Sequence, residues 1–353
     1  MSPGNATAWP RAADDTPAQT PVAPEDARVA RRRRRRPRPP SVPARMRRAL
    51  LTSISLALLA ACLLGIVLRL WVQDRRATSL AMYYYATPPA VLAGLALAAA
   101  LLWLMRKRWR PAFPTLLLSL VCAAWSYQVT WFDNPPGPTT PGGHVLFWNV
   151  AHGTCGWRNV AADIRKRNAD IIGLVEAGTD LPRLTAFWER ELPGYQAHVC
   201  QSGITLLARG DVQHVASGSL NGYGSYEHFE TAVGGRPLHV VVVDFEGTLA
   251  RTRLWPVEAL VGVLEPLAGQ PVLLMGDFNT PTDSFYLTPL RRRLTNAFEV
   301  AGDGCAATWP FPLPVLTIDQ AWFNEHVRVA RCTNGWSWYS DHRPVELDVS
   351  VAP

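Results

Sequence analysis

The chain has 353 residues, of which 48% are hydrophobic and 18% are charged, and this length fits two domains better than one. Residues 1–48 hold twelve Arg and four acidic residues, a net charge of +8, whereas residues 144–353 hold 16 basic and 22 acidic residues, a net charge of −6. The overall charge of +7 therefore does not describe a basic nucleic-acid-binding domain, and the composition excludes a wholly disordered or wholly soluble chain.

Residues 1–48 are predicted to form a disordered basic tail. They are rich in Ala, Pro, Thr and Arg, so they bury too little apolar surface to offset the entropy of ordering. The uninterrupted run Arg31–Arg36 is compatible with nuclear targeting, with an RNA-binding arm or with an anchor on lipid headgroups. The lipid anchor is favoured, because an apolar span follows almost at once.

Three uncharged stretches predict three transmembrane helices within residues 49–132. Ala49–Leu68 has twenty residues, which is long enough to cross the hydrocarbon core of a bilayer. The second stretch is Ala77–Met105, with its apolar centre at Pro89–Met105, and the third is Pro111–Phe132. Three buried core helices are the alternative, but helices of a soluble protein carry a polar face that these stretches lack.

The charged flanks of the spans predict their orientation. The tail and the loop Arg106–Arg110 are strongly basic, and basic segments stay on the cytoplasmic side. A cytoplasmic N-terminus and three spans place the rest of the chain on the periplasmic or extracellular side of a multi-pass membrane protein. Residues 133–143 read DNPPGPTTPGG and are predicted to be a linker, because Pro and Gly interrupt helices and strands.

Cysteine usage leaves the redox compartment open. Cys155, Cys200, Cys305 and Cys332 follow the linker, and an even number is compatible with two disulfides in any of three connectivities, or with four free thiols. No Cys-x-x-Cys or His–Cys spacing indicates a structural zinc site.

Residues 144–353 are predicted to form one α/β domain. Short apolar runs alternate with amphipathic segments, which is typical of a largely buried sheet covered by helices. Strands are expected at residues 144–149, 170–175, 239–243, 271–275, 315–323 and 344–351, a hairpin at 197–208, and helices at 157–167, 184–191 and 255–267.

Polar residues follow several of these strands. Asn149, Glu176 and Asp277 stand at or just past a strand end, where side chains from different strands share one crevice. Asn279, Asp319, Asp341 and His342 are expected to join them. An ordinary turn residue is the alternative for each carboxylate or amide, and a surface histidine is the alternative for His342. Several oxygen ligands and one histidine together suit Mg²⁺ or Mn²⁺.

The motifs FWNV, GLVEAG, GDFN, TWP…P…TID and SDHRP occur in this order within residues 144–353. In this respect the chain resembles the endonuclease/exonuclease/phosphatase superfamily of metal-dependent phosphoesterases, and its three-span anchor resembles a membrane-attached bacterial subgroup. The resemblance implies a four-layer αββα sandwich preceded by the three transmembrane helices, and hydrolysis of a phosphoester with a divalent cation.

The resemblance also implies a role for each site residue. Glu176 would be the principal metal ligand, Asn149 would lie beside the metal and the phosphate, and Asp341 would assist the metal or the water. Asp277 would orient or deprotonate the attacking water, and Asn279 would hold that water or a phosphate oxygen. His342 would donate to a phosphate oxygen, with Asp319 fixing its tautomer. These roles agree with the needs of the chemistry, which are an in-line water, a base and positive charge near the phosphate oxygens.

One residue departs from the family pattern. The superfamily commonly has a His at the end of the strand 241–245, and this chain has Asp244. Asp244 either adds a metal ligand or is a structural turn residue, and both interpretations stay open.

Two functions of different class follow. The first is a membrane-anchored hydrolase of phosphomonoesters or phosphodiesters, active outside the cytoplasm. A small molecule or a lipid headgroup is the favoured substrate, because the net charge of −6 disfavours long duplex DNA. A short nucleic acid stays open through Arg291–Arg293. The second is a catalytically degenerate ligand-binding or scaffolding module, which Asp244 favours. Membrane lipids are expected partners in both cases, and the sequence leaves any protein partners unknown.

Overall fold

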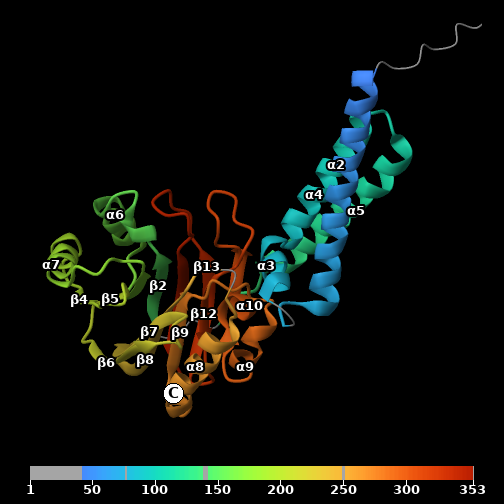
Figure 1. The fold of residues 1–353 in the computed structure, drawn as a ribbon. Helices are drawn as coiled ribbons and strands as arrows, with labels where there is room; N and C mark the ends of the chain where they lie inside the picture. The colour runs from blue at the N-terminus through green and yellow to red at the C-terminus, as the bar shows by residue number, and fades with distance from the viewer. Residues whose placement is uncertain (1–41, 76–77, 138–141, 249–250, 353) are drawn as a thin grey trace, which may run out of the picture. The chain divides into compact units, whose positions relative to one another are not determined.

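A computed structural model describes residues 42–75, 78–137, 142–248 and 251–352 (Figure 1). The chain divides into two compact units, residues 1–49 and residues 50–353. Most of the tail, with Arg31–Arg36, lies outside the described residues. Residues 42–48, which were expected to be disordered, instead begin the first helix.

Four helices occupy most of the apolar region: α2 (Val42–Val67), α3 (Thr78–Ala86), α4 (Pro89–Met105) and α5 (Trp109–Thr130). A short π-helix, Leu68–Val72, continues α2. Within the described residues, the α2 segment and α5 are each long and apolar enough to cross a membrane. Helices α3 and α4 meet that criterion only as a pair, and a bend of 78° separates them. The expectation of three continuous spans is therefore corrected to two, or three if the bent pair is one span, because Pro88 and Pro89 interrupt the helix.

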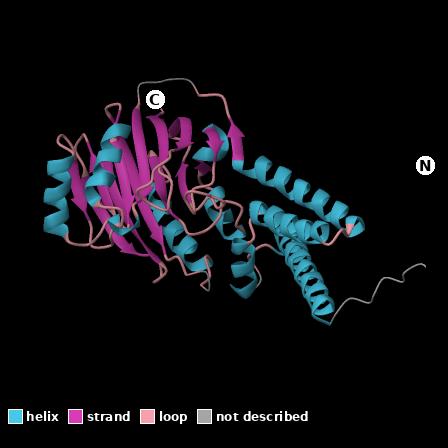
Figure 2. Cartoon of the chain, turned by 90° about the horizontal axis from the view of Figure 1, so that it is seen from above, coloured by secondary structure: helices cyan, strands magenta, loops and turns pink. Residues whose placement is uncertain are grey.

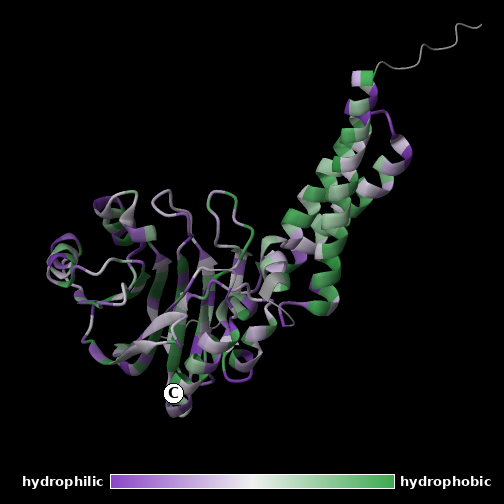
Figure 3. Cartoon of the chain, in the orientation of Figure 1, coloured by the Kyte–Doolittle hydropathy of each residue, from purple (hydrophilic) through white to green (hydrophobic). Residues whose placement is uncertain are grey.

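Helices α2, α4 and α5 pack together mainly through small and thiol-bearing side chains. Cys62, Leu92, Ala96 and Cys122 are buried at their contact, and small residues allow helices to approach closely. Apolar residues cover most of these helices (Figure 3). Large apolar side chains point outward, among them Leu56, Leu63, Leu101, Leu117 and Leu120. Such an outward apolar surface is what lipid surroundings favour.

Residues 131–352 contain two mixed sheets with helices beside them (Figure 2). The first has the order β1 (Trp131–Asp133), β11 (Gly302–Cys305), β13 (Val327–Asn334), β14 (Val345–Val351), β2 (Gly143–Asn149), β3 (Ile171–Val175), β5 (Thr205–Ala208) and β4 (Gln196–Val199). The second has the order β10 (Thr295–Asn296), β12 (Asp319–Phe323), β9 (Val272–Asp277), β8 (Arg236–Phe245), β7 (Gly224–Val233) and β6 (Gln213–Ser219).

The sheets pack face to face and bury a core between them. Val145 and Phe147 of β2 share this core with Val240 and Val242 of β8, because alternate residues of a strand point to one face. The intervening residues of β2 pack under α6 (Trp157–Arg167) and α7 (Leu181–Glu191), and those of β8 pack under α8 (Leu254–Leu264). The layers are helix, sheet, sheet and helix, as the α/β sandwich expected from the sequence requires.

Three local expectations differ from the structure. Strand β1 pairs with β11, whereas the sequence placed its residues in the third span and the linker. The strand expected at 315–323 begins only at Asp319, because the preceding segment folds back through a Trp309–Leu316 bridge. All six cysteines are free thiols, so the structure has free thiols rather than the two disulfides that an even number of cysteines also allowed.

Asp74 joins the turn after the π-helix to the loop at residues 283–285. Its carboxylate is fully buried and accepts hydrogen bonds from Tyr85 Oη at 2.7 Å, from the Phe285 backbone N at 2.9 Å and from the Ser284 hydroxyl. The Arg69 guanidinium, also buried, donates to the Tyr84 carbonyl at 2.8 Å and pairs with Asp283. These bonds fix both segments.

Replacing Asp74 with Ala is expected to lower the free energy of unfolding by about 3–5 kcal/mol, because three buried donors lose their acceptor. Thermal unfolding of the detergent-solubilised chain measures the effect. Asp303→Ala removes an exposed carboxylate and is the matched control. An Asp74→Ala variant as stable as that control would contradict the prediction.

Candidate functional site

Three aspartates lie side by side on neighbouring strands of the second sheet. Asp277 ends β9 and is in register with Asp244 of β8 and with Asp319, which opens β12. Residues in register share one face of a sheet, so the three carboxylates lie close together. Such a group is unfavourable unless a proton or a cation reduces its charge.

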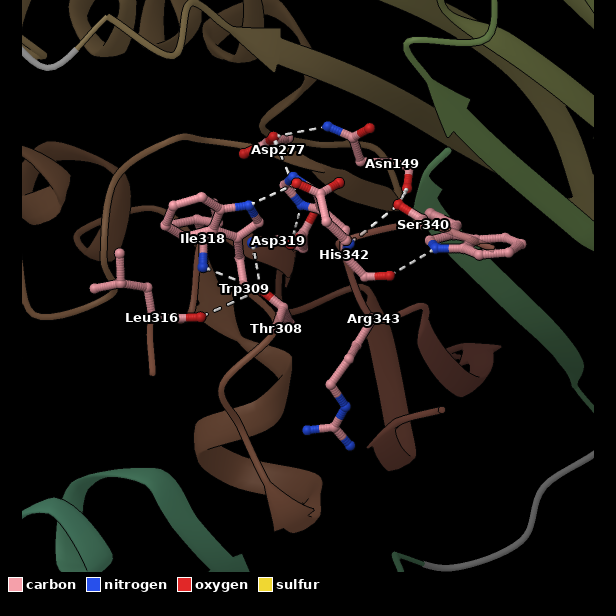
Figure 4. Close-up of polar contacts among 12 residues, drawn as sticks. Asn149, Asp277, Thr308, Trp309, Leu316, Ile318, Asp319, Ser340, His342 and Arg343 are labelled. Carbon is pink, nitrogen blue, oxygen red and sulfur yellow. Dashed lines mark hydrogen bonds and ion pairs between the residues drawn. The ribbon is translucent and has the colours of Figure 1, made fainter. Parts of the chain in front are cut away.

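His342 lies against these carboxylates (Figure 4). Its Nδ1 is 2.8 Å and 3.0 Å from the two carboxylate oxygens of Asp319 and 3.9 Å from Asp277 Oδ2. The Ser340 hydroxyl donates to the Asn149 carbonyl at 2.7 Å and accepts the His342 backbone N–H at 3.0 Å. The turn is thereby fixed, and an Nδ1–H bound to Asp319 leaves Nε2 available to a ligand.

Burial and neighbouring charges change the proton affinities of this group. Burial disfavours the imidazolium, but the Asp319 and Asp277 carboxylates outweigh burial and raise the pKa of His342 to about 10. Burial and Asp319 raise the pKa of Asp277 to about 7. Burial, Asp277 and Glu176 raise the pKa of Asp244 well above its usual range. At neutral pH the site therefore contains a cationic histidine beside carboxylates that bind positive charge readily.

Asn149 links Asp277 to Glu176. It is fully buried at the end of β2, and its Nδ2 donates to Asp277 Oδ2 at 3.0 Å and to Glu176 Oε1 at 3.1 Å. Its Oδ1 accepts the Ala151 backbone N–H at 2.9 Å, so the amide holds the two carboxylates in place. Glu176 has a left-handed backbone with φ of +51°, a conformation that costs energy in residues other than Gly and is common at functional sites.

Asn279 and Asp341 lie at the margins of the group. The Asn279 backbone N–H donates to Asp277 Oδ1 at 2.8 Å, while its side-chain amide donates to the Phe245 carbonyl at 2.8 Å. The Asp341 carboxylate is exposed and accepts the indole N–H of Trp309 at 3.0 Å. Asn279 thus positions Asp277, and Asp341 lies beside a tryptophan rather than within the row of aspartates.

A cavity of about 490 Å³ opens at the site, lined by Glu176, Asp341 and His342 on its polar side. Phe311 and Trp338 line it too, with ring centroids 4.7 Å apart, and Trp338 is 74% exposed. No site role was predicted from the sequence for this aromatic rim or for His152, whose Nε2 is 3.2 Å from Glu176 Oε2. Only the fold brings these residues to the cavity, since they lie on separate loops.

The donor set fits a divalent cation. Asp277 and Asp319 each offer one carboxylate oxygen, and these atoms and a ring nitrogen of His342 all lie within 4.8 Å of one another. The cationic His342 is a donor to an anion rather than a metal ligand, and Glu176 adds a carboxylate at the cavity. Oxygen-rich sites with surplus negative charge suit hard cations such as Mg²⁺ and Mn²⁺.

Replacing Asp244 with Asn is expected to raise the unfolding temperature by a few degrees in EDTA at pH 8. The pKa of Asp244 is higher in the folded chain than in the unfolded one. The fold therefore loses stability as pH rises above the unfolded pKa and through the folded pKa, and a neutral Asn does not carry this cost. Thermal unfolding with Asp303→Asn as control measures this, and a lower unfolding temperature would contradict it. A weaker response to added Mg²⁺ would identify Asp244 as a ligand rather than a turn residue.

Part of the chain matches a known family in sequence. Residues 146–342 match the family model described as "Endonuclease/Exonuclease/phosphatase family". No curated protein matches the chain in sequence. Among solved structures, a functionally unknown conserved protein from Enterococcus faecalis has 16% identity and a TM-score of 0.49, covering 59% of this chain and 99% of its own. The human Nocturnin catalytic domain with bound sulfate has 19% identity and a TM-score of 0.48, covering 62% and 100%. A mannosyl-6-phosphatase from Bacteroides thetaiotaomicron has 16% identity and a TM-score of 0.46, covering 59% and 99%.

Proposed function

Because the chain belongs to the Endonuclease/Exonuclease/phosphatase family, we propose that it is a membrane-anchored hydrolase that cleaves a phosphomonoester or phosphodiester with Mg²⁺ or Mn²⁺. The main support is the buried Asp319–His342 pair beside Asp277, within the site that Asn149 organises. A histidine with a purely structural role does not need two buried carboxylates at a cavity wall.

In the proposed mechanism the chain supplies an acid and a base. His342, cationic through Asp319, donates a hydrogen bond from Nε2 to a non-bridging phosphate oxygen and stabilises the charge that develops there. Asp277, with a pKa of about 7, accepts a proton from the attacking water, and a base is most effective when its pKa is near the working pH. The backbone N–H of Asn279 orients the Asp277 carboxylate.

A divalent cation, when bound, neutralises phosphate charge and lowers the barrier to attack. Glu176 would be its principal ligand, and Asp341 would add a carboxylate from the cavity wall. Asn149 holds Glu176 and Asp277 in a fixed relation and would lie beside both the metal and the phosphate.

We propose a small phosphoester or a lipid headgroup as the substrate. The net charge of −6 on residues 144–353 disfavours long duplex DNA, and the exposed ring of Trp338 at the cavity suits an apolar or interfacial substrate. A substrate screen should include short nucleic acids, which are the alternative substrate class.

The proposed organisation is a basic tail (1–48), a membrane segment (49–132), a linker (133–143) and a hydrolase domain (144–353). With a cytoplasmic N-terminus, three spans place the hydrolase domain outside the cytoplasm, and two spans would keep it inside. A reporter that works only outside the cytoplasm, fused after residue 353, should be active if the hydrolase domain lies outside the cytoplasm. Activity of a cytoplasm-specific reporter would overturn the proposed location.

Removal of divalent cations is expected to abolish turnover. Detergent-solubilised chain should hydrolyse generic monoester or diester substrates with Mg²⁺ or Mn²⁺, lose activity in EDTA and regain it when the cation is restored. A folded chain that turns over no substrate of a broad panel with either cation would support the alternative, a degenerate ligand-binding or scaffolding module.

A further inference from the structure

A second group of metal-ligating side chains lies at the edges of the two sheets. Cys200 directly follows β4, the edge strand of the first sheet, and His214 belongs to β6, the edge strand of the second. Glu227 comes from β7, the neighbour of β6. The Sγ, imidazole nitrogen and carboxylate oxygen of these residues all lie within 4.8 Å of one another.

Glu227 is the buried centre of this group. It is 3% exposed, its Oε1 accepts the Ser202 hydroxyl at 2.7 Å, and its Oε2 lies 2.7 Å from His214 Nε2. A buried carboxylate needs a charged or hydrogen-bonding partner. The half-exposed His214 provides such a partner from the solvent side. The Cys200 thiol lies near the same carboxylate, within 4.8 Å.

His198 supplies a second, independent observation. Its Nε2 is buried and has no hydrogen-bond partner in the described part of the chain, which is an unfavourable state for a ring nitrogen. His198 lines the same cavity of about 500 Å³ as Cys200, His214 and Glu227. This ring nitrogen is closed to solvent and unpaired beside three ligand-type side chains, so the polar groups at this cavity are not all satisfied within the described residues.

We propose that Cys200, His214 and Glu227 bind a Zn²⁺-like transition-metal cation that ties the edges of the two sheets together. Thiolate, imidazole and carboxylate are the three ligand types that Zn²⁺ takes, whereas Mg²⁺ selects oxygen ligands. A water would complete a tetrahedral set. The site is separate from the hydrolase site, because β8 lies between the strand of Glu227 and that of Asp277, and it does not depend on the proposed hydrolysis.

The expected role of this site is structural. Its ligands come from three strand segments that belong to different sheets, and the cation would bind the folded chain alone. Binding to the folded state only stabilises that state. The cation would therefore fix the side of the sandwich where β4 and β6 are the last strands of their sheets among the described residues.

Cobalt is a suitable probe for the site, because a cobalt–thiolate bond gives a charge-transfer absorption that oxygen and nitrogen ligands do not. Full-length chain in detergent is stripped with EDTA and titrated with Co²⁺ in excess Mg²⁺. A thiolate-to-cobalt band that saturates at one equivalent, disappears when Zn²⁺ is added and accompanies a higher unfolding temperature is expected.

Variants assign the band. Cys200→Ser should abolish it, and Glu227→Gln and His214→Ala should each weaken Co²⁺ binding by at least about 10-fold. Cys155→Ser, at an exposed cysteine elsewhere, and Asp277→Asn should keep it. An unfolding temperature of stripped Cys200→Ser close to that of the stripped chain shows that the variant folds. Absence of the band, or a band that survives Cys200→Ser, would overturn the proposal.

Discussion

Asp277→Asn is expected to lower kcat for phosphoester hydrolysis by about 10²- to 10⁴-fold, because an amide cannot accept the proton of the attacking water. The substitution keeps the size of this buried side chain. It loses one hydrogen bond, since its NH₂ group would face the Asn149 NH₂, at a cost of about 1 kcal/mol. It also removes a negative charge beside Asp319, which offsets part of that cost. The variant should therefore fold.

Steady-state kinetics in Mg²⁺ measure the effect, with thermal unfolding to verify folding. A fall in kcat with little change in KM is expected if Asp277 acts in the transition state rather than in substrate binding. Asp303→Asn makes the same chemical change at an exposed position and should retain full activity. An Asp277→Asn variant within 10-fold of the wild-type kcat would remove Asp277 from the role of base.

The layered fold was predictable because its central strands are continuous apolar runs. Strands β2, β3 and β9 were expected within one or two residues of their observed limits, and helix α6 within its observed limits. The three strands are buried on both faces, so a continuous apolar run identifies each of them. Helix α6 buries one face, with Val160, Ala161 and Ile164, so its helical spacing identifies it.

Elements at the margins of the sandwich were not predictable in the same way. Strand β6 reads QHVASGS and is mostly exposed, so it carries no continuous apolar pattern, and its partner β7 and strand β13 were missed as well. The bend between α3 and α4 was missed because the absence of charge indicates only that a stretch is apolar and not that its helix runs straight. Pro88 and Pro89 were the signal for the bend.

The sequence indicated which residues would meet at the candidate site but not how they contact one another. Asn149, Asp277, Asp319 and His342 stand next to strand ends. Hydrogen bonds join Asn149 to Asp277 and His342 to Asp319, and an ion-pair contact of 3.9 Å joins His342 to Asp277. Asp341 follows the same pattern, but its side chain turns to Trp309. A side-chain direction within a turn depends on tertiary contacts. The proposed cation site at Cys200, His214 and Glu227 was even less predictable from the sequence, because these three residues form no short motif.

Asp319→Asn is expected to move the basic limb of the pH–rate profile to lower pH. In the wild type the Asp319 carboxylate helps to raise the pKa of His342 to about 10 against the effect of burial. If the imidazolium is the form that contacts the phosphate and the Asp277 carboxylate is the base, kcat/KM should be high between about pH 7 and about pH 10 and fall as pH rises through about 10. An Asn at position 319 still accepts the Nδ1–H but carries no charge.

Without that charge, only Asp277 and Asp341 offset the effect of burial, and the pKa of His342 should fall toward the ordinary histidine value of about 6.5. At pH 8–9 most of the variant would then hold neutral His342, so kcat/KM should drop by roughly 10²-fold there and much less near pH 6. Measuring kcat/KM from pH 5.5 to 10 for both proteins, with Asp303→Asn as the control, tests the shift. A uniform loss at every pH would mean that Asp319 only supports the fold around His342. A shift confined to the basic limb would mean that its charge maintains the acid, because only the charge, and not the hydrogen bond, differs between the two side chains.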